Sequence, residues 1–278
     1  MCHVRFGIDI AQQRLEWDEL VGRARLGEDL GFDGAWGFDH FKPMYGEGPG
    51  NCFEGMTTLA ALASATSRIR LGLQVTGVTY RHPSVLAAEA ITIDHASGGR
   101  LELALGAAWF EDEHRELGIP FPPIGERIDR LEDTVEVVRQ LCTGEEITWT
   151  GRTLALHGAR LRPLPVQRPH PPIWIGASGE RRTLPLAGRL ADAWHSFGDA
   201  TTLARKWEIV AGAAEQTGRD PASILRAGSL SLSGDLAGVA RELDAHQRAG
   251  TAYLVCGWPG EGQLRVEEFA AQLMTAAG

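Results

Sequence analysis

The sequence lacks an apolar run of about 20 residues, the length that a membrane-spanning helix needs. It also lacks a basic run, and its formal net charge of −9 argues against nucleic acid or an anionic membrane as a partner. Its four cysteines show no Cys-x-x-Cys spacing, and its first residues are too few and too strand-like for a secretory leader. These absences predict a cytoplasmic protein with reduced thiols.

The chain is organised around residues 69–111. Residues 69–76 are short and rich in branched apolar side chains, as in a buried strand. Apolar residues then recur at helical spacing over 84–96, behind a proline suited to a first helical turn. Residues 101–105 form a second apolar run. Together they predict a βαβ unit with parallel strands, whose carboxyl ends are where ligands bind in α/β folds.

About eight such units follow one another along the chain. The strands are expected at residues 4–10, 34–38, 69–76, 101–105, 173–175, 191–194, 224–232 and 252–256. The helices are expected at 16–30, 53–65, 84–96, 126–142, 180–188, 203–217, 236–249 and 264–276. This order predicts an α/β fold, a (β/α)8 TIM barrel, with residues 1–278 as one domain.

Two segments interrupt the alternation. Residues 147–161 alternate around two glycines and predict a β-hairpin insertion after the fourth helix. Residues 107–125 are polar and aromatic, and we expect a long functional loop there. A doubly wound dinucleotide fold is the rival, but Asp9-Ile10-Ala11-Gln12 stands where that fold requires a glycine-rich fingerprint.

Asp39 and His40 directly follow the second predicted strand, on the ligand-binding end of a barrel. A histidine there can donate a hydrogen bond to a heteroaromatic ring or transfer protons near neutral pH. The adjacent Asp39 could fix its tautomer. A structural loop histidine is the alternative.

Two small-residue segments follow other strand ends. Gly176, Ala177, Ser178 and Gly179 would let backbone N–H groups approach an anion at a helix N-terminus. An ordinary tight turn is the alternative account. The arginines at 181 and 182 are expected in the first turn of that helix, where the helix dipole disfavours positive charge. A phosphate bound nearby would make this placement tolerable. Residues 106–108 (Gly-Ala-Ala) would form a flat backbone platform at the end of a strand. Ordinary tight packing is an equally good account of these small residues.

Other polar residues are expected to be structural. Glu54 begins a helix, where an acid complements the dipole. Residues 111–114 (Glu-Asp-Glu-His) have no partner at ligand spacing, so we expect a solvated loop and no metal site. His195 ends a strand and could face the pocket, but a hydrogen-bonded structural role is the simpler expectation.

Four segments together resemble the bacterial luciferase-like monooxygenase superfamily, and within it the coenzyme F420-dependent oxidoreductases. They are GFDGAWGFDHF at 31–41, ATSRIRLGLQVTGVTYRHPSVLA at 65–87, SGGRLELALGAAWFEDE at 97–113 and RPHPPIWIGASGERRTLPLAGRLADAW at 168–194. Each segment is weak alone and the set is specific. The final third of the chain is not diagnostic.

The resemblance implies a TIM barrel with a deazaflavin across its C-terminal mouth. Asp39 and His40 would border the ring, and Gln74-Val75 would form a cis peptide bond beneath it. Gly106, Ala107 and Ala108 would contact the cofactor, and Gly176, Ala177, Ser178 and Gly179 would hold its phosphate. His40 is the catalytic candidate.

The sequence departs from the family pattern at four positions. Ala108 replaces a common glycine, and Trp109 stands where the glucose-6-phosphate dehydrogenase branch carries its proposed catalytic acid. Met44 stands where the same branch has an aromatic substrate contact. His195 stands where relatives often have asparagine. Sugar phosphate chemistry is therefore not expected.

The resemblance predicts hydride transfer between F420 and a small organic substrate. An FMN-dependent monooxygenase and a catalytically silent cofactor-binding barrel are the alternatives. Relatives also suggest a homodimer formed through the helices of the first half, and the helix at 53–65 is apolar on more than one face.

Overall fold

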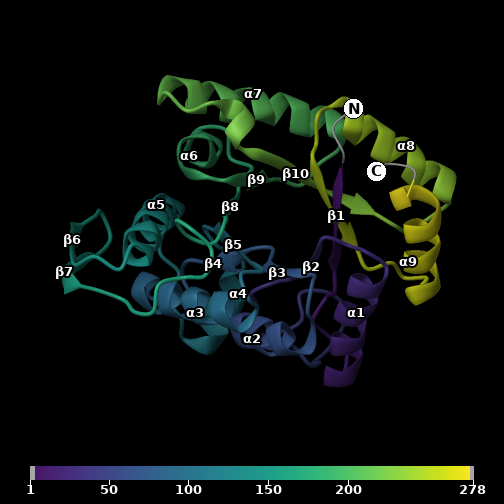
Figure 1. Ribbon diagram of the computed structural model, residues 1–278, viewed down its shortest axis with the longest axis horizontal. Helices are drawn as coiled ribbons and strands as arrows, with labels where there is room; N and C mark the ends of the chain where they lie inside the picture. The colour runs from purple at the N-terminus through teal and green to yellow at the C-terminus, as the bar shows by residue number, and fades with distance from the viewer. Residues whose placement is uncertain (1–3, 276–278) are drawn as a thin grey trace.

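The computed structural model describes residues 4–275, in which parallel strands close into a barrel (Figure 1). The barrel strands are β1 (Arg5–Asp9), β2 (Gly34–Gly37), β3 (Arg70–Leu73), β4 (Thr76–Gly77), β5 (Leu101–Gly106), β8 (Ile173–Gly176), β9 (Ala193–His195), β10 (Leu225–Ser231) and β11 (Tyr253–Gly257). Neighbours pair in parallel in the order β3-β2-β1-β11-β10-β9-β8-β5, and β3 pairs with β5 to close the ring. The predicted TIM barrel is confirmed. The single predicted third strand is divided into β3 and β4.

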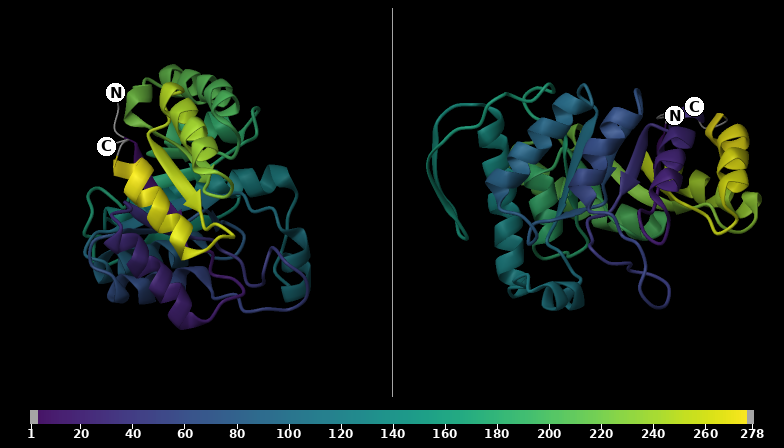
Figure 2. Two further views of the ribbon diagram at one scale, coloured as in Figure 1. Left: turned by 90° about the vertical axis from the view of Figure 1, so that its right-hand side faces the viewer. Right: turned by 90° about the horizontal axis from the view of Figure 1, so that it is seen from below.

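Helices surround the barrel on its outside (Figures 1 and 2). They are α1 (Trp17–Asp29), α2 (Gly55–Ala65), α3 (Pro83–Ala96), α4 (Glu111–Leu117), α5 (Ile124–Cys142), α6 (Thr183–Leu190), α7 (Ala200–Gln216), α8 (Leu236–Arg248) and α9 (Gln263–Phe269). A 3-10 turn (Pro221–Ser223) precedes β10, and a π-helical turn (Ala270–Met274) extends α9. Most predicted bounds agree within three residues, and position 276 of the last predicted helix lies outside the described residues.

The expected loop at 107–125 contains a helix, α4, so that prediction was wrong. Two of the seven α4 residues, Glu113 and His114, are fully buried although both are polar. Gly118 ends the helix in the left-handed conformation, with φ of 69°. A helix that buries polar groups shows no hydrophobic periodicity, and this hid α4 in the sequence.

The hairpin insertion is confirmed, with β6 (Ile147–Thr150) paired antiparallel to β7 (Ala155–Ala159). Its turn is fastened to α5 by Asp133, whose carboxylate accepts hydrogen bonds from the backbone N–H groups of Arg152 (3.2 Å) and Thr153 (2.7 Å). In Figure 1 the rest of the hairpin extends away from the barrel at its left edge.

Aromatic residues fill the barrel interior. The rings of Trp36 and Trp174 have centroids 4.8 Å apart, and the indole N–H of Trp36 donates to the Tyr253 hydroxyl at 2.9 Å. The neighbouring Gly72 makes this packing possible, because a Cβ there would lie 2.5 Å from the Trp36 ring. Val75 packs on the same cluster from the C-terminal side. The cluster therefore forms a floor below the barrel mouth.

No helix between residues 4 and 275 is long and apolar enough to cross a membrane. Cys142 and Cys256 are buried free thiols and Cys52 is half-buried, whereas Cys2 lies outside the described residues. These three cysteines are unpaired, in agreement with the expectation of reduced thiols.

Candidate active site

Loops at the carboxyl ends of four strands bring the predicted residues together at one end of the barrel. Asp39 and His40 follow β2, Gln74 and Val75 separate β3 from β4, residues 106–108 end β5, and residues 176–179 follow β8. Because all these strands are parallel, their carboxyl ends lie at the same mouth. The sequence prediction that these segments share one end of the fold is therefore supported by the topology.

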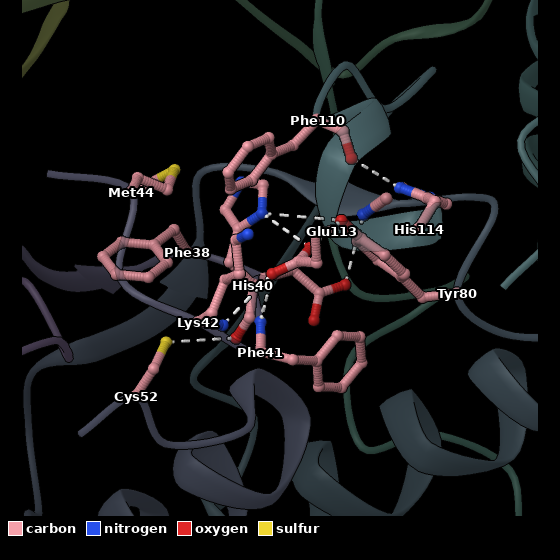
Figure 3. A network of polar contacts seen from close by, with 12 residues as sticks. Phe38, His40, Phe41, Lys42, Met44, Cys52, Tyr80, Phe110, Glu113 and His114 are labelled. Carbon is pink, nitrogen blue, oxygen red and sulfur yellow. Dashed lines mark hydrogen bonds and ion pairs between the residues drawn. The ribbon is translucent and has the colours of Figure 1, made fainter. Parts of the chain in front are cut away.

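His40 interacts with Glu113 of α4, and not with its neighbour Asp39 (Figure 3). The Nδ1 atom of His40 lies 3.0 Å from Glu113 Oε2, and the Tyr80 hydroxyl donates to the same oxygen. Glu113 Oε1 accepts the backbone N–H groups of Phe41 (2.7 Å) and Lys42 (3.1 Å). The solvated-loop interpretation of residues 111–114 was therefore wrong for Glu113, and also for His114, which is equally buried.

The charge state of Glu113 follows from these contacts. Burial would raise its pKa, but the hydrogen bonds from His40 and Tyr80 outweigh that effect and hold the pKa below its usual value. An ionised carboxylate only accepts hydrogen bonds, so His40 must carry a proton on Nδ1. Glu113 thus fixes the tautomer of His40, the role expected of Asp39.

Asp39 instead forms a two-armed ion pair with Arg81, at 2.6 and 2.9 Å. Its Oδ2 also accepts the backbone N–H of Gly77 at 3.2 Å, directly after the bulge that separates β3 from β4. Glu54 contacts the same arginine and also caps α2, as its position predicted, by accepting the N–H groups of Met56 and Thr57. Asp39 therefore positions the bulge and does not act on His40.

The peptide bond between Gln74 and Val75 is cis, as the resemblance implied. The Val75 side chain projects towards Gly106 and Gly176, where a Cβ atom at either glycine would collide with it. Both glycines are thus needed to admit Val75. This supports the tight-packing account of residue 106, and it shows that residue 176 has a packing role besides any contact with an anion.

Three observations bear on whether a ring cofactor fits this mouth. The side-chain amide nitrogen of Gln74 is buried and has no hydrogen-bond partner among residues 4–275, so it is available as a donor. Ala108 adopts φ of 58°, and Arg127 holds its carbonyl oxygen at 2.7 Å. The exposed ring of Trp109 lies 5.7 Å from that of His40 and shields one side of it. An unpaired donor beside a rigid bulge and an aromatic wall suits a planar heteroaromatic ring.

The 176–179 loop is less open than its sequence suggests. The N–H of Ala177 donates to the His195 carbonyl at 3.0 Å, and the N–H of Gly179 donates to the Thr183 hydroxyl at 2.9 Å. Ser178 is exposed, and its hydroxyl lies 2.9 Å from that of Ser196. An anion at this loop would therefore contact Ser178 and the N–H groups at the start of α6.

Lys206 of α7 is a cation that sequence reasoning missed. Its buried ammonium group donates to the Ser196 hydroxyl at 2.8 Å, which links it to Ser178. Lys206 is the seventh residue of α7, and nothing in the sequence around it marks it as a binding residue. Arg181 and Arg182 both precede α6, so their placement in its first turn was wrong. Arg182 pairs with Asp129 of α5 at 2.6 Å.

His195 is a buried structural residue. Its Nε2 atom lies 3.0 Å from the Ser229 hydroxyl, and burial together with the charge of Lys206 lowers its pKa to about 3. The ring is thus neutral at physiological pH. The simpler expectation for this position agrees with these contacts.

Known proteins resemble this chain in sequence and in fold. An F420-dependent hydroxymycolic acid dehydrogenase of Mycobacterium tuberculosis is 31% identical over 86% of this chain and 65% of its own length. An FMNH2-dependent dimethylsulfone monooxygenase of Pseudomonas putida is 29% identical over 68% of this chain and 52% of its own length. The chain therefore spans about half to two thirds of these relatives.

The fold is shared more widely than the sequence. An F420-dependent secondary alcohol dehydrogenase, solved with an F420-acetone adduct, superposes with a TM-score of 0.87 at 18% identity, over 96% of this chain and 97% of that one. Residues 1–267 match the family described as luciferase-like monooxygenase. The chain belongs to the luciferase-like monooxygenase family.

Proposed function

We propose that this protein is an F420-dependent oxidoreductase that transfers hydride between the deazaflavin and a small organic substrate. The observation that carries the proposal is the pairing of His40 with the buried, ionised Glu113 at the barrel mouth. The hydroxymycolic acid dehydrogenase supports F420 as the cofactor, since it is the more similar of the two relatives described above.

Residues of four loops would hold the cofactor. The free amide of Gln74 would donate to the ring, the bulge at Val75 would support one ring face, and Ser178 would contact the phosphate. Residues 106–108 would border the ring from β5. When bound, the deazaflavin supplies the hydride chemistry and the protein supplies position and electrostatics.

His40 would act through Nε2, because its Nδ1 proton is committed to Glu113. The aromatic rings of Phe38, Trp109 and Phe110 lie with centroids 5.6–5.8 Å from the imidazole and limit the access of water to it. A positioned imidazole can hold or transfer a proton at the substrate atom where charge develops. General acid–base help of this kind is worth about 10²–10⁴ in rate.

Titration of the apoprotein with F420 and FMN side by side tests the cofactor assignment. We expect tighter binding of F420, and tight FMN binding with no F420 affinity would favour the monooxygenase alternative. Stoichiometric cofactor binding without turnover of any substrate would favour the silent barrel.

Two variants test the catalytic assignment. His40→Ala should lower turnover by about 10²–10⁴ with a smaller loss of cofactor affinity. His40→Gln separates a hydrogen-bonding role, which it preserves, from proton transfer, which it abolishes. Turnover of His40→Ala at the parent rate with saturating cofactor would assign His40 to loop structure.

A homodimer and a cytoplasmic location complete the proposal. The apolar residues of α2 are mostly buried in the protomer's own core, so they no longer support the dimer. Exposed Val85 at the start of α3 and Ile124 at the start of α5 offer apolar surface in the first half of the chain. Light scattering at micromolar concentration tests the oligomeric state, and a monomer there would refute the dimer.

A further inference from the structure

A cleft of about 340 Å³ lies outside the barrel, between α5, α6 and the turn of the β6–β7 hairpin. Four of its eight lining residues are arginines. The lining residues are Ile128, Glu132, Arg152, Arg181, Arg182, Pro185, Leu186 and Arg189. Positive charge is thus concentrated here although the whole chain has a net charge of −9.

The acids beside this arginine cleft do not neutralise it. Asp129 pairs with Arg152 at 2.8 Å and with Arg182 at 2.6 Å. Glu132 pairs with Arg189 at 2.9 Å and lies 3.3 Å from Arg152. Asp133, which accepts the backbone N–H of Arg152, is a third carboxylate close to that arginine, so four guanidinium groups against three carboxylates leave about one positive charge. Within residues 4–275, Arg181 forms no ion pair, so at least one guanidinium is available to a ligand.

The cleft adjoins the loop that would hold the cofactor phosphate. Arg181 follows Gly179 by two residues, and consecutive Cα atoms are about 3.8 Å apart, so its backbone lies within about 8 Å of that loop. Arg152 approaches the same place from the hairpin turn, which Asp133 fastens to α5. The insertion therefore adds a second cation, Arg152, to the cleft that contains Arg181.

We propose that the arginine cleft binds the carboxylates that F420 carries beyond its phosphate. This inference rests on the proposed function. F420 continues past the phosphate into a lactyl-oligoglutamate tail, whereas FMN ends at the phosphate, so the cleft distinguishes the two cofactors. Arginine suits carboxylates because its planar fork donates two parallel hydrogen bonds. The apolar side chains of Ile128, Pro185 and Leu186 provide surface for the methylene groups of the tail.

Equilibrium binding to the apoprotein tests the proposal, with the deazaflavin followed by fluorescence. Arg181→Glu and Arg152→Glu are compared with Arg160→Glu, a control near the same hairpin that pairs with Glu146 at 3.7 Å. The ligands are F420 with several glutamates and the same deazaflavin ending at its phosphate, which carries no carboxylate. Arg181→Glu is the decisive variant, because removing Arg152 also releases two contacts to α5.

We expect each cleft variant to weaken binding of the long-tailed cofactor by roughly three- to tenfold, as for one partly exposed charge. Binding of the tail-less ligand, and of either ligand to the control, should change by less than twofold. The effect should shrink as salt rises above about 0.15 M.

Equal affinity of Arg181→Glu and wild type for the long-tailed cofactor would refute the arginine cleft while leaving the proposed function intact. An equal loss for both ligands would also refute it, since the cleft would then act on the phosphate. Wild-type protein that binds FMN but not F420 would refute the proposed function itself.

Discussion

The substitution Glu113→Gln should reverse the tautomer of His40. The backbone N–H groups of Phe41 and Lys42 donate to Glu113 Oε1, so the amide oxygen of a glutamine must occupy that position. The NH2 group then faces His40 Nδ1 and the Tyr80 hydroxyl. An NH2 group only donates, so Nδ1 must lose its proton and Nε2 must gain one.

The stability change should be modest because every group keeps a partner. The Tyr80 hydroxyl can rotate to accept a hydrogen bond, and the packing of a residue with no exposed surface is preserved. What is lost is the charge on four hydrogen bonds to a carboxylate, each worth about 1.5–3 kcal/mol against about 0.5–1.5 for a neutral bond, or about 4 kcal/mol in all. A neutral glutamine also avoids the cost of burying a charge, which offsets about half of that loss. We expect the free energy of unfolding to fall by about 2 kcal/mol at pH 7.

Nitrogen NMR of protein labelled with ¹⁵N-histidine measures the tautomer directly, without a substrate. The chain has nine histidines, so the His40→Gln variant serves to assign the resonance. In wild type the protonated nitrogen of His40 should be Nδ1, and in Glu113→Gln it should be Nε2. Turnover should fall by a large part of the 10²–10⁴ assigned to His40.

The matched control is Glu116→Gln, also on α4, whose side chain pairs with Lys42 at the surface. It should change neither the tautomer nor turnover, and its stability by less than about 1 kcal/mol. Protonated Nδ1 in folded Glu113→Gln would refute the argument, because it would show that another group fixes the imidazole.

Three further predictions concern the loops. Ser178→Asp should weaken binding of F420 and FMN at least tenfold in a titration, because its carboxylate would face the phosphate, and unchanged affinity would remove the phosphate assignment. Ala108→Gly should raise the free energy of unfolding by about 1 kcal/mol in denaturant melts, since φ of 58° strains any residue with a Cβ, and a loss of stability would show that the methyl group is needed. Glu28 accepts the N–H groups of Ser67, Arg68 and Ile69, which outweigh burial and lower its pKa from 4.5 to about 2. Its stabilisation is therefore complete above about pH 4.5 and is lost as pH falls towards 2. Glu28→Gln should destabilise by about 1–3 kcal/mol at pH 7, and its difference from wild type should shrink across that window; a constant difference would contradict the assignment.

The barrel could be predicted from the sequence because its signals are local. Each strand is a short apolar run, each helix has its own periodicity, and glycines mark the hairpin turns. Strand ends also indicated where the site lies, since parallel strands share one carboxyl end. These inferences needed no knowledge of which distant residues touch.

The contacts within the site could not be predicted in this way. Adjacent residues of an extended segment point to opposite sides, so Asp39 and His40 cannot readily serve one another. Their partners lie 42 and 73 residues further along the chain, at Arg81 and Glu113. A single sequence holds no record of such pairings, and Glu113 lay in a helix whose buried polar residues concealed it.

The aromatic cluster beneath Val75, around Trp36, Trp174 and Tyr253, limits how the proposed substrate site can change. Gly7, Gly34 and Gly72, from three strands, all abut the Trp36 ring, and a Cβ at any of them would collide with it. Shortening Trp36 would leave a void costing about 3–5 kcal/mol. The floor of the barrel mouth is therefore fixed, so new specificities must come from the loops at its rim. Directed evolution towards larger substrates should be productive in residues 41–52 and 109–123, and futile in the strands.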